Sequence, residues 1–251
     1  MTYCVGILLD QGMVFASDSR TNAGLDNIAS FCKMTVLENR GERVIVLLSS
    51  GNLAGTQAVV SLLKQRGVLQ NQGGPPTVWS VNTMFDVAGL VADAMREIDH
   101  RDGPYLHDSG GFNASFILGG QIRGEPMRLF RIYAEGNFIE ADLGMTRYFQ
   151  TGEAKYGKPI IDRVVTPATS LADAAKCVLV SFDSTMRSNL SVGMPIDLAC
   201  YQRDSLQVQM RRRFVEGDAY FSALSSQWSA GVREVFSRLP EPELTDGANC
   251  H

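Results

Sequence analysis

A hydroxyl residue at the second position of the chain could act as a nucleophile. Thr2 directly follows Met1, and a small second residue normally permits removal of the initiator methionine. The freed Thr2 would carry both a nucleophile, its Oγ atom, and a base, its own α-amine, which is a known pairing. An α-amine has an ordinary pKa of about 7.7–8.0, so it is partly neutral near pH 7 and can accept a proton without a histidine. Many proteins carry a small residue here, so the hypothesis depends on what surrounds Thr2.

Two charged residues are placed to assist this threonine. Residues 2–9 and 13–17 read as the strands of a hairpin. The hairpin returns the chain to the level of Thr2, so Asp18, just after the second strand, can approach it. Lys33 follows a polar loop and sits among apolar residues. A lysine near an α-amine lowers that amine's pKa by charge repulsion, and an aspartate beside the lysine keeps it charged. Asp18 and Lys33 are therefore predicted to be an orienting pair around Thr2.

A serine–glycine sequence ends the next strong strand, which covers residues 43–48. In Ser49-Ser50-Gly51 the glycine permits close backbone approach, and its N–H group could stabilise an oxyanion. A simple strand-to-helix turn is the alternative reading of the same residues. Thr21, Phe31, Cys32 and Ser49 are expected to line a substrate pocket near Thr2.

The order of predicted elements indicates how these residues are held. The first strand is apolar on both faces, which is typical of a strand covered on both sides. We predict further strands at 28–31, 34–37, 110–120, 128–134, 138–141, 148–151, 196–201 and 206–210. Helices are predicted at 53–64, after a Ser80 cap with a stripe from Met84 to Ile98, after Thr169 or Ser170, and at 214–239. This order favours an α+β fold, a four-layer αββα sandwich of two antiparallel sheets, over an α+β domain with one sheet. A single domain over 1–251 with a polar tail at 240–251 is the simplest organisation.

Composition excludes several classes of function. The chain has 251 residues, of which 45% are hydrophobic and 20% charged, with a net charge of −4. The charge gives no support for a nucleic-acid or membrane partner, and no apolar run approaches the roughly 20 residues that span a bilayer. The N-terminus does not resemble a secretory signal, so the expected location is the cytoplasm. The three histidines and five cysteines show no metal-ligand spacing, so no metal or other cofactor is expected, and the cysteines are expected to be reduced.

The combination of these residues resembles a known family. Thr2 opening a strand, Lys33 after a polar loop and Ser50-Gly51 before a helix are similar to proteasome β-type subunits. The stretch from Phe15 to Gly24, which contains Ala16-Ser17-Asp18-Ser19-Arg20, and the stretch from Thr151 to Pro159 are closest to the bacterial proteasome-related family called Anbu. The resemblance implies an N-terminal-nucleophile hydrolase fold. It also implies assembly of identical subunits into a ring or a helical variant of one.

The same resemblance implies roles for individual residues. Thr2 would be the nucleophile, Asp18 and Lys33 its supporting pair, and Gly51 the oxyanion-hole amide. Thr151 falls near a serine that contacts the threonine amine in proteasome subunits. After the third helix those subunits carry an Asp-x-x-Ser-Gly pattern, whereas this chain has Ser188-Asn189-Leu190-Ser191-Val192. Ser191 can stand for the serine, but Ser188 replaces the aspartate, so the hydrogen bonds around the amine are altered.

The predicted function is therefore a threonine peptidase or amidohydrolase that acts on a peptide or amide through an acyl-enzyme. A catalytically idle ring scaffold and an amide transferase that uses the same acyl-enzyme are the alternatives. The basic run Arg211-Arg212-Arg213 is interpreted as a solvated face or a subunit contact, because the net charge of −4 disfavours nucleic acid.

Overall fold

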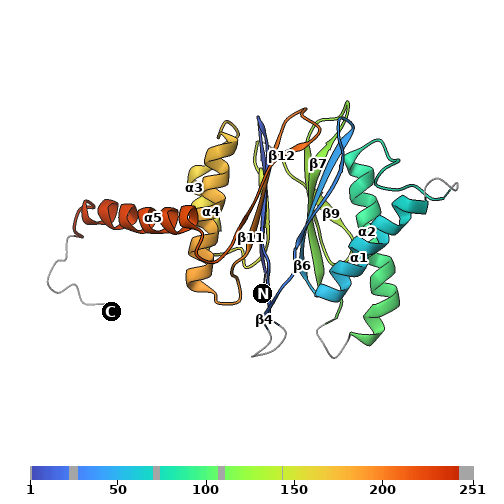
Figure 1. The fold of residues 1–251 in the computed structure, drawn as a ribbon, viewed down its shortest axis with the longest axis horizontal. Coiled ribbons are helices and arrows are strands. Elements are labelled where there is room, and N and C mark those ends of the chain that lie inside the picture. The colour runs from blue at the N-terminus through green and yellow to red at the C-terminus, as the bar shows by residue number, and fades with distance from the viewer. Residues whose placement is uncertain (1, 23–27, 70–73, 107–110, 143, 243–251) are drawn as a thin grey trace, which may run out of the picture. The chain divides into compact units, whose positions relative to one another are not determined.

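The fold consists of two five-stranded antiparallel sheets packed face to face, with helices outside each sheet (Figure 1). The computed structural model describes residues 2–22, 28–69, 74–106, 111–142 and 144–242. They fall into two compact units, residues 1–216 and 217–251. The predicted αββα sandwich is confirmed, and it lies in the first unit. One domain over the whole chain stays a prediction, and tail residues 243–251 lie outside the described residues.

The first sheet is built around the N-terminal strand, which is buried along its whole length. Alternate residues of this strand face in opposite directions: Tyr3 packs against Phe182 of a covering helix, while Cys4 and Leu8 join the core between the sheets. The strand order is β10-β1-β2-β11-β12. Its members are β1 (Tyr3–Leu9), β2 (Gly12–Asp18), β10 (Tyr148–Gly152), β11 (Ile196–Gln202) and β12 (Val208–Phe214).

The second sheet contributes the other half of the central core. Val44, Val46 and Leu48 face the first sheet, and Ile45 and Leu47 between them face the helices. The strand order is β5-β6-β7-β8-β9, and a separate two-stranded ribbon pairs β3 with β4. The strands are β3 (Arg20–Asn22), β4 (Ile28–Ser30), β5 (Met34–Asn39), β6 (Arg43–Gly51), β7 (Ala114–Ile122), β8 (Arg128–Ile132) and β9 (Phe138–Glu140).

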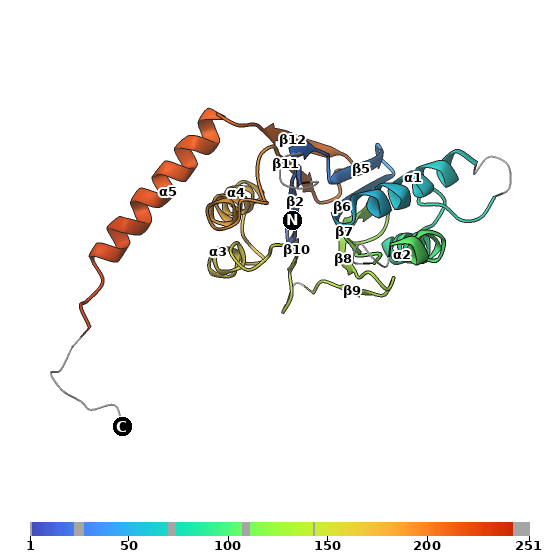
Figure 2. The same ribbon diagram turned by 90° about the horizontal axis from the view of Figure 1, so that it is seen from below.

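One pair of helices covers each sheet (Figures 1 and 2). The second sheet is covered by α1 (Leu53–Leu69) and α2 (Met84–Asp102), which is followed by the 3₁₀ turn η2 (Gly103–Tyr105). The first sheet is covered by α3 (Lys158–Val164) and α4 (Leu171–Ser188), which begins at an Ser170 cap as predicted. The α3 helix was not predicted, because seven residues with one buried apolar side chain carry little periodicity.

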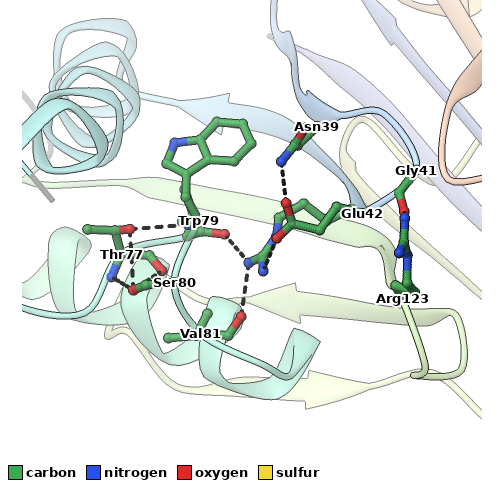
Figure 3. A network of polar contacts seen from close by, with 10 residues as sticks. Asn39, Gly41, Glu42, Thr77, Trp79, Ser80, Val81 and Arg123 are labelled. Carbon is green, nitrogen blue, oxygen red and sulfur yellow. Dashed lines mark hydrogen bonds and ion pairs between the residues drawn. The ribbon is translucent and has the colours of Figure 1, made fainter. Parts of the chain in front are cut away.

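Two predicted helix boundaries were wrong. Thr83, not Ser80, caps α2, because its hydroxyl accepts the Asp86 amide. Ser80 instead closes a turn with Thr77, as Figure 3 shows. The last helix, α5 (Ala219–Ser237), starts behind an Asp218 cap, whereas Phe214 ends β12. Within its own unit α5 buries only Phe221 of its predicted apolar face, and Trp228, Val232 and Val235 are exposed.

A buried arginine, Arg43, connects the second sheet to the segment before α2 by hydrogen bonds. Arg43 donates hydrogen bonds to the carbonyls of Val78 and Val81, each at 2.9 Å. On its other side it pairs with the Glu42 carboxylate at 2.8 Å, in the network drawn in Figure 3. The positive charge of Arg43 is tolerated in a buried position because its guanidinium group has these two carbonyls and one carboxylate as partners.

Candidate active site

Thr2 directly precedes β1, the second strand of the first sheet. Its carbonyl accepts the Glu153 amide at 2.7 Å, which binds it to the chain just after β10. Gly152 permits this approach: it has a φ of +80°, and a Cβ atom there would lie 1.8 Å from the Thr2 carbonyl oxygen. Because side chains alternate along a strand, the half-buried Thr2 side chain shares the face of Cys4, towards the second sheet.

Asp18 and Lys33 meet beside this threonine. The Tyr3 amide, next along the chain from Thr2, donates to Asp18 Oδ1 at 3.0 Å. Lys33 Nζ donates to the same oxygen at 2.8 Å and to the Arg20 carbonyl at 2.7 Å. Both charged side chains are buried, with exposed fractions of 0% for Asp18 and 6% for Lys33. The structure thus brings together the three residues that the sequence placed at one site.

Burial sets the electrostatics of the pair. It raises the pKa of Asp18 above that of an exposed aspartate, and the Lys33 charge and the Tyr3 amide lower it part of the way back. The Gly193 amide also lowers this pKa. The neighbouring Cys4 thiol has a pKa raised by burial, so it is a poor nucleophile.

Unpartnered polar atoms gather at the same place. Within the described residues, five buried side-chain nitrogen or oxygen atoms have no hydrogen-bond partner in the protein. Four of them belong to residues 17–21: Ser17 Oγ, Asp18 Oδ2, Arg20 Nε and Thr21 Oγ1. Buried polar groups are normally satisfied, so such a concentration is typical of a functional site rather than of a core.

Three hydroxyl groups join the two sheets beside Thr2. Thr151 Oγ1 lies 2.7 Å from Ser50 Oγ and 2.8 Å from Ser115 Oγ, and the two serine oxygens are 2.8 Å apart. Thr151 therefore uses its hydroxyl within this triangle, and its predicted contact with the Thr2 amine stays a prediction. Ser115 was missed because only the pairing of β6 with β7 sets it opposite Ser50.

Gly51 occupies a backbone position that excludes other residues. It has a φ of +101°, and a Cβ atom there would lie 1.7 Å from the Asn113 carbonyl oxygen. The Ser49 amide donates to the Lys33 carbonyl at 2.9 Å, and the Asn52 amide donates to Asn113 on the opposite side at 2.6 Å. Amides alternate sides along a strand, so the Gly51 amide is directed to the side where Lys33 lies.

Gly51→Ala is expected to lower the free energy of unfolding by about 2–3 kcal/mol, through overpacking and a strained φ. Gly111→Ala is the matched control: its φ is +76°, but nothing lies within 4 Å of the added Cβ, so it carries the backbone strain alone. Urea unfolding of both variants measures the difference. Equal costs would show that the contact with Asn113 relaxes freely.

The residues after α4 are hydrogen-bonded to the segment that follows β10. Ser188 is exposed at the end of the helix. Asn189 instead makes the connection, because its Nδ2 donates to Glu153 Oε2 at 2.7 Å and its Oδ1 accepts the Ser191 amide at 2.9 Å. Glu153 is buried, and its own amide holds the Thr2 carbonyl. The carboxylate of Glu153, directly after β10, thus lies between Thr2 and the residues that follow α4. The spacing of these residues in the sequence could not show this connection.

A cavity of about 710 Å³ is lined by Cys32 and Met34, the chain neighbours of Lys33, although Lys33 and Thr2 themselves are not among its lining residues. Ser49 and Cys32 line it, as predicted, whereas Thr21 and Phe31 are not among its lining residues. Phe31 is 39% exposed. The sequence missed the walls contributed by α1, β11 and β12, which include Lys64, Asp197 and Arg211.

The described residues contain neither a metal-binding cluster nor a membrane-spanning helix. Among the described residues no group of histidine, cysteine, aspartate or glutamate side chains could hold a metal ion. No helix in that part of the chain has the length and apolar character to cross a membrane. Cys4, Cys32, Cys177 and Cys200 are free thiols, and Cys250 lies outside the described residues.

Solved structures resemble this chain over nearly its whole length. An Anbu Gly-1 mutant from Hyphomicrobium sp. strain MC1 is 50% identical, with a TM-score of 0.89, over 97% of this chain and 100% of that one. Anbu from Yersinia bercovieri, described as an ancestral beta-subunit, is 46% identical with a TM-score of 0.89 over the same shares. The helical assembly of the Anbu complex from Pseudomonas aeruginosa is 48% identical with a TM-score of 0.90, over 98% and 100%. No protein-family model matches, and no curated protein does.

Two face-to-face sheets between helical layers, with Thr2 directly before the buried first strand, define a proteasome-like β-subunit. Sequence identities of 46–50% to Anbu proteins, over at least 97% of this chain, identify its family within that class. The chain belongs to the Anbu family.

Proposed function

We propose that this protein is a threonine N-terminal-nucleophile hydrolase that cleaves a peptide or amide bond through Thr2 after removal of Met1. One observation carries the proposal. A buried Asp18–Lys33 ion pair is anchored to the amide next to Thr2. A buried ion pair is an expensive element for stability alone, so its place beside a potential nucleophile favours a catalytic role.

The proposed reaction needs no group beyond the chain and water. Thr2 Oγ attacks the carbonyl carbon while the α-amine takes its proton, and the Gly51 amide stabilises the oxyanion. The resulting ammonium gives that proton to the departing amine, which leaves an ester on Thr2. A water molecule, deprotonated by the α-amine, then attacks the ester and releases the acid. The positive charge of Lys33 lowers the pKa of the amine, which keeps it neutral near pH 7.

There are two alternatives to hydrolysis, one of which is supported by a particular observation. A catalytically idle scaffold is favoured by the exposed Ser188, which stands where proteasome subunits have an aspartate. Amide transfer is the other, with an amine in place of water as acceptor for the same ester on Thr2. Product analysis with added amines separates transfer from hydrolysis.

We propose that the chain forms a homo-oligomer, a ring or helical assembly, in the cytoplasm. A helical assembly is described for the Pseudomonas aeruginosa protein, which is 48% identical. Light scattering of the purified protein is expected to give a mass of several subunits, and a stable monomer at micromolar concentration would contradict the assembly.

The state of the N-terminus tests the proposed chemistry most directly. The intact mass of protein purified from its native host is expected to lack Met1, because an acylated Thr2 nitrogen could not act as a base. Incubation with a peptide epoxyketone, which needs both the hydroxyl and the free amine, is expected to add one inhibitor mass per chain at Thr2. Retention of Met1 in the native protein would refute the mechanism, and processed protein without an adduct would favour the idle scaffold.

A further inference from the structure

The basic run of β12 is divided between the two faces of the first sheet. A register shift in the pairing of β11 with β12 places Arg211 and Arg213 on the face that carries Phe15, towards the second sheet. Arg212 lies on the opposite face and stacks over the Phe214 ring at 4.5 Å. The sequence alone suggested a solvated basic face or a subunit contact, whereas the register directs two of the three arginines towards the second sheet.

These arginines form one wall of the cavity beside the candidate active site. The other wall is a stripe along one side of α1, and the free edge of β5 lies between them; β12, β5 and α1 follow one edge of the sandwich in Figure 2. From Leu53 to Lys64 this wall is about 16 Å long at 1.5 Å per helical residue. That length matches about five residues of an extended chain. The stripe comprises Leu53, Thr56, Gln57, Val60, Ser61 and Lys64.

The groove has an excess of positive charge. Apart from Arg212, which lies on the opposite face, its lining contains three basic side chains and one carboxylate, which leaves a net charge of +2 on a chain whose total is −4. The carboxylate, Asp197, already accepts the Ser19 hydroxyl at 2.9 Å and lies 3.6 Å from Arg213. Within the described residues neither Lys64 nor Arg211 forms an ion pair with a carboxylate. Two cations, one on each wall, are therefore available to an anionic ligand.

The shape of the groove favours a peptide over a nucleic acid. Both β5 and β12 are edge strands, so their outer backbone groups can pair with an added strand. None of the residues that line the groove is aromatic, so it offers no platform on which bases could stack. Cys32 and Ser49 line the groove, Cys32 directly precedes Lys33, and the Ser49 amide donates to the Lys33 carbonyl at 2.9 Å, so the groove adjoins the segment that carries Lys33.

We propose that this groove binds an extended acidic segment of the substrate, with glutamate or aspartate side chains against Lys64 and Arg211. The inference rests on the proposed function and names the class of peptide that the same site takes. The basic run of β12 would then help to select the substrate, because its positive charge favours acidic peptides over neutral or basic ones.

The test is binding to processed full-length protein that carries Thr2→Ala, so that no turnover occurs. Fluorescence anisotropy at 50 mM salt compares fluorescein-labelled hexapeptides of alternating glutamate and alanine with the same peptides carrying glutamine or lysine. The glutamate peptide is expected to bind at least about tenfold more tightly than the glutamine peptide. Its binding should also slow alkylation of Cys32, the exposed thiol that lines the groove.

Two double variants test whether the charges of the groove cause the difference in affinity. Lys64→Gln with Arg211→Gln removes one charge from each wall and is expected to weaken binding of the glutamate peptide about fivefold to tenfold, without effect on the glutamine peptide. Lys158→Gln with Lys176→Gln removes two exposed charges from the helical layer on the first sheet and should change affinity less than twofold.

Three outcomes would overturn the inference: equal affinity for the glutamate and glutamine peptides, equal losses in the two double variants, or tighter binding of a ten-nucleotide thymidine oligomer than of the glutamate peptide. Binding is measured without the nucleophile. Selective binding without hydrolysis by the parent protein would therefore refute the proposed function alone.

Discussion

Replacing Thr2 by alanine is expected to abolish epoxyketone labelling and to lower the rate of hydrolysis at least about 10³-fold. The alanine variant keeps the α-amine, the strand and the Asp18–Lys33 pair, but it has no oxygen to form the ester. The Thr2 carbonyl, which accepts the Glu153 amide, belongs to the backbone and is unchanged. The melting temperature should therefore stay within a degree or two of the parent value while activity disappears.

Thr2→Ser is the matched control for this experiment. Serine retains the hydroxyl and the small size that permits removal of Met1, so it should form the adduct, at a lower rate. Mass spectrometry of the three proteins after the same incubation gives the comparison. Equal turnover by the alanine and threonine proteins would assign the activity to another residue, and loss of labelling in the serine protein would point to a requirement for the threonine methyl group.

Replacing Lys33 by methionine is expected to destabilise the fold by about 3–5 kcal/mol and to eliminate activity. The substitution leaves Asp18 charged, buried and without its cation, while methionine fills a similar volume. The Tyr3 amide, at 3.0 Å, would be the remaining hydrogen-bond donor to that carboxylate. Urea unfolding at pH 7 measures the loss.

A double-mutant cycle and the pH dependence identify the cause. Asp18→Asn with Lys33→Met removes both charges and should recover more than half of the stability lost in the single variant. Burial raises the Asp18 pKa, and loss of Lys33 raises it further, so the folded variant binds a proton more tightly than the unfolded chain. Its stability deficit relative to the parent should shrink as the pH falls from 7 towards 5. A deficit that is constant over this range would assign the loss to packing instead of charge.

Local sequence patterns determined the part of the site that lies close together along the chain. A two-residue period and a short turn fix the hairpin register, and the observed pairing of Cys4 with Ser17 places Asp18 level with Tyr3. The first strand is apolar on both faces, and an apolar face of a sheet must be covered. Together with the two clusters of predicted helices, this pattern predicted two stacked sheets with a helical layer outside each. These inferences held because period and turn chemistry act over a few residues.

Helix boundaries show where local patterns are ambiguous. Phe214 fits the apolar face of a helix as well as it fits a strand, and pairing with Ile196 on β11 decides for the strand. Ser80 and Thr83 are both residue types that cap helices. Ser80 hydrogen-bonds to Thr77 in a turn, so Thr83 caps the helix. In each case a tertiary or neighbouring contact chose between conformations of similar local preference.

The sequence by itself determined the identity of the Thr2, Asp18 and Lys33 set, because a hairpin and the strand that follows it can bring these residues together. Only the tertiary structure decided that Glu153 joins Asn189 beside Thr2, and that Lys64 and Arg211 face one groove. Those residues come from elements far apart in the chain. Their meeting depends on which strands end at the edges of the two sheets and on a single register shift in β12. Periodicity cannot specify such a meeting, since it records which side of its own element a residue occupies and not which other element lies opposite.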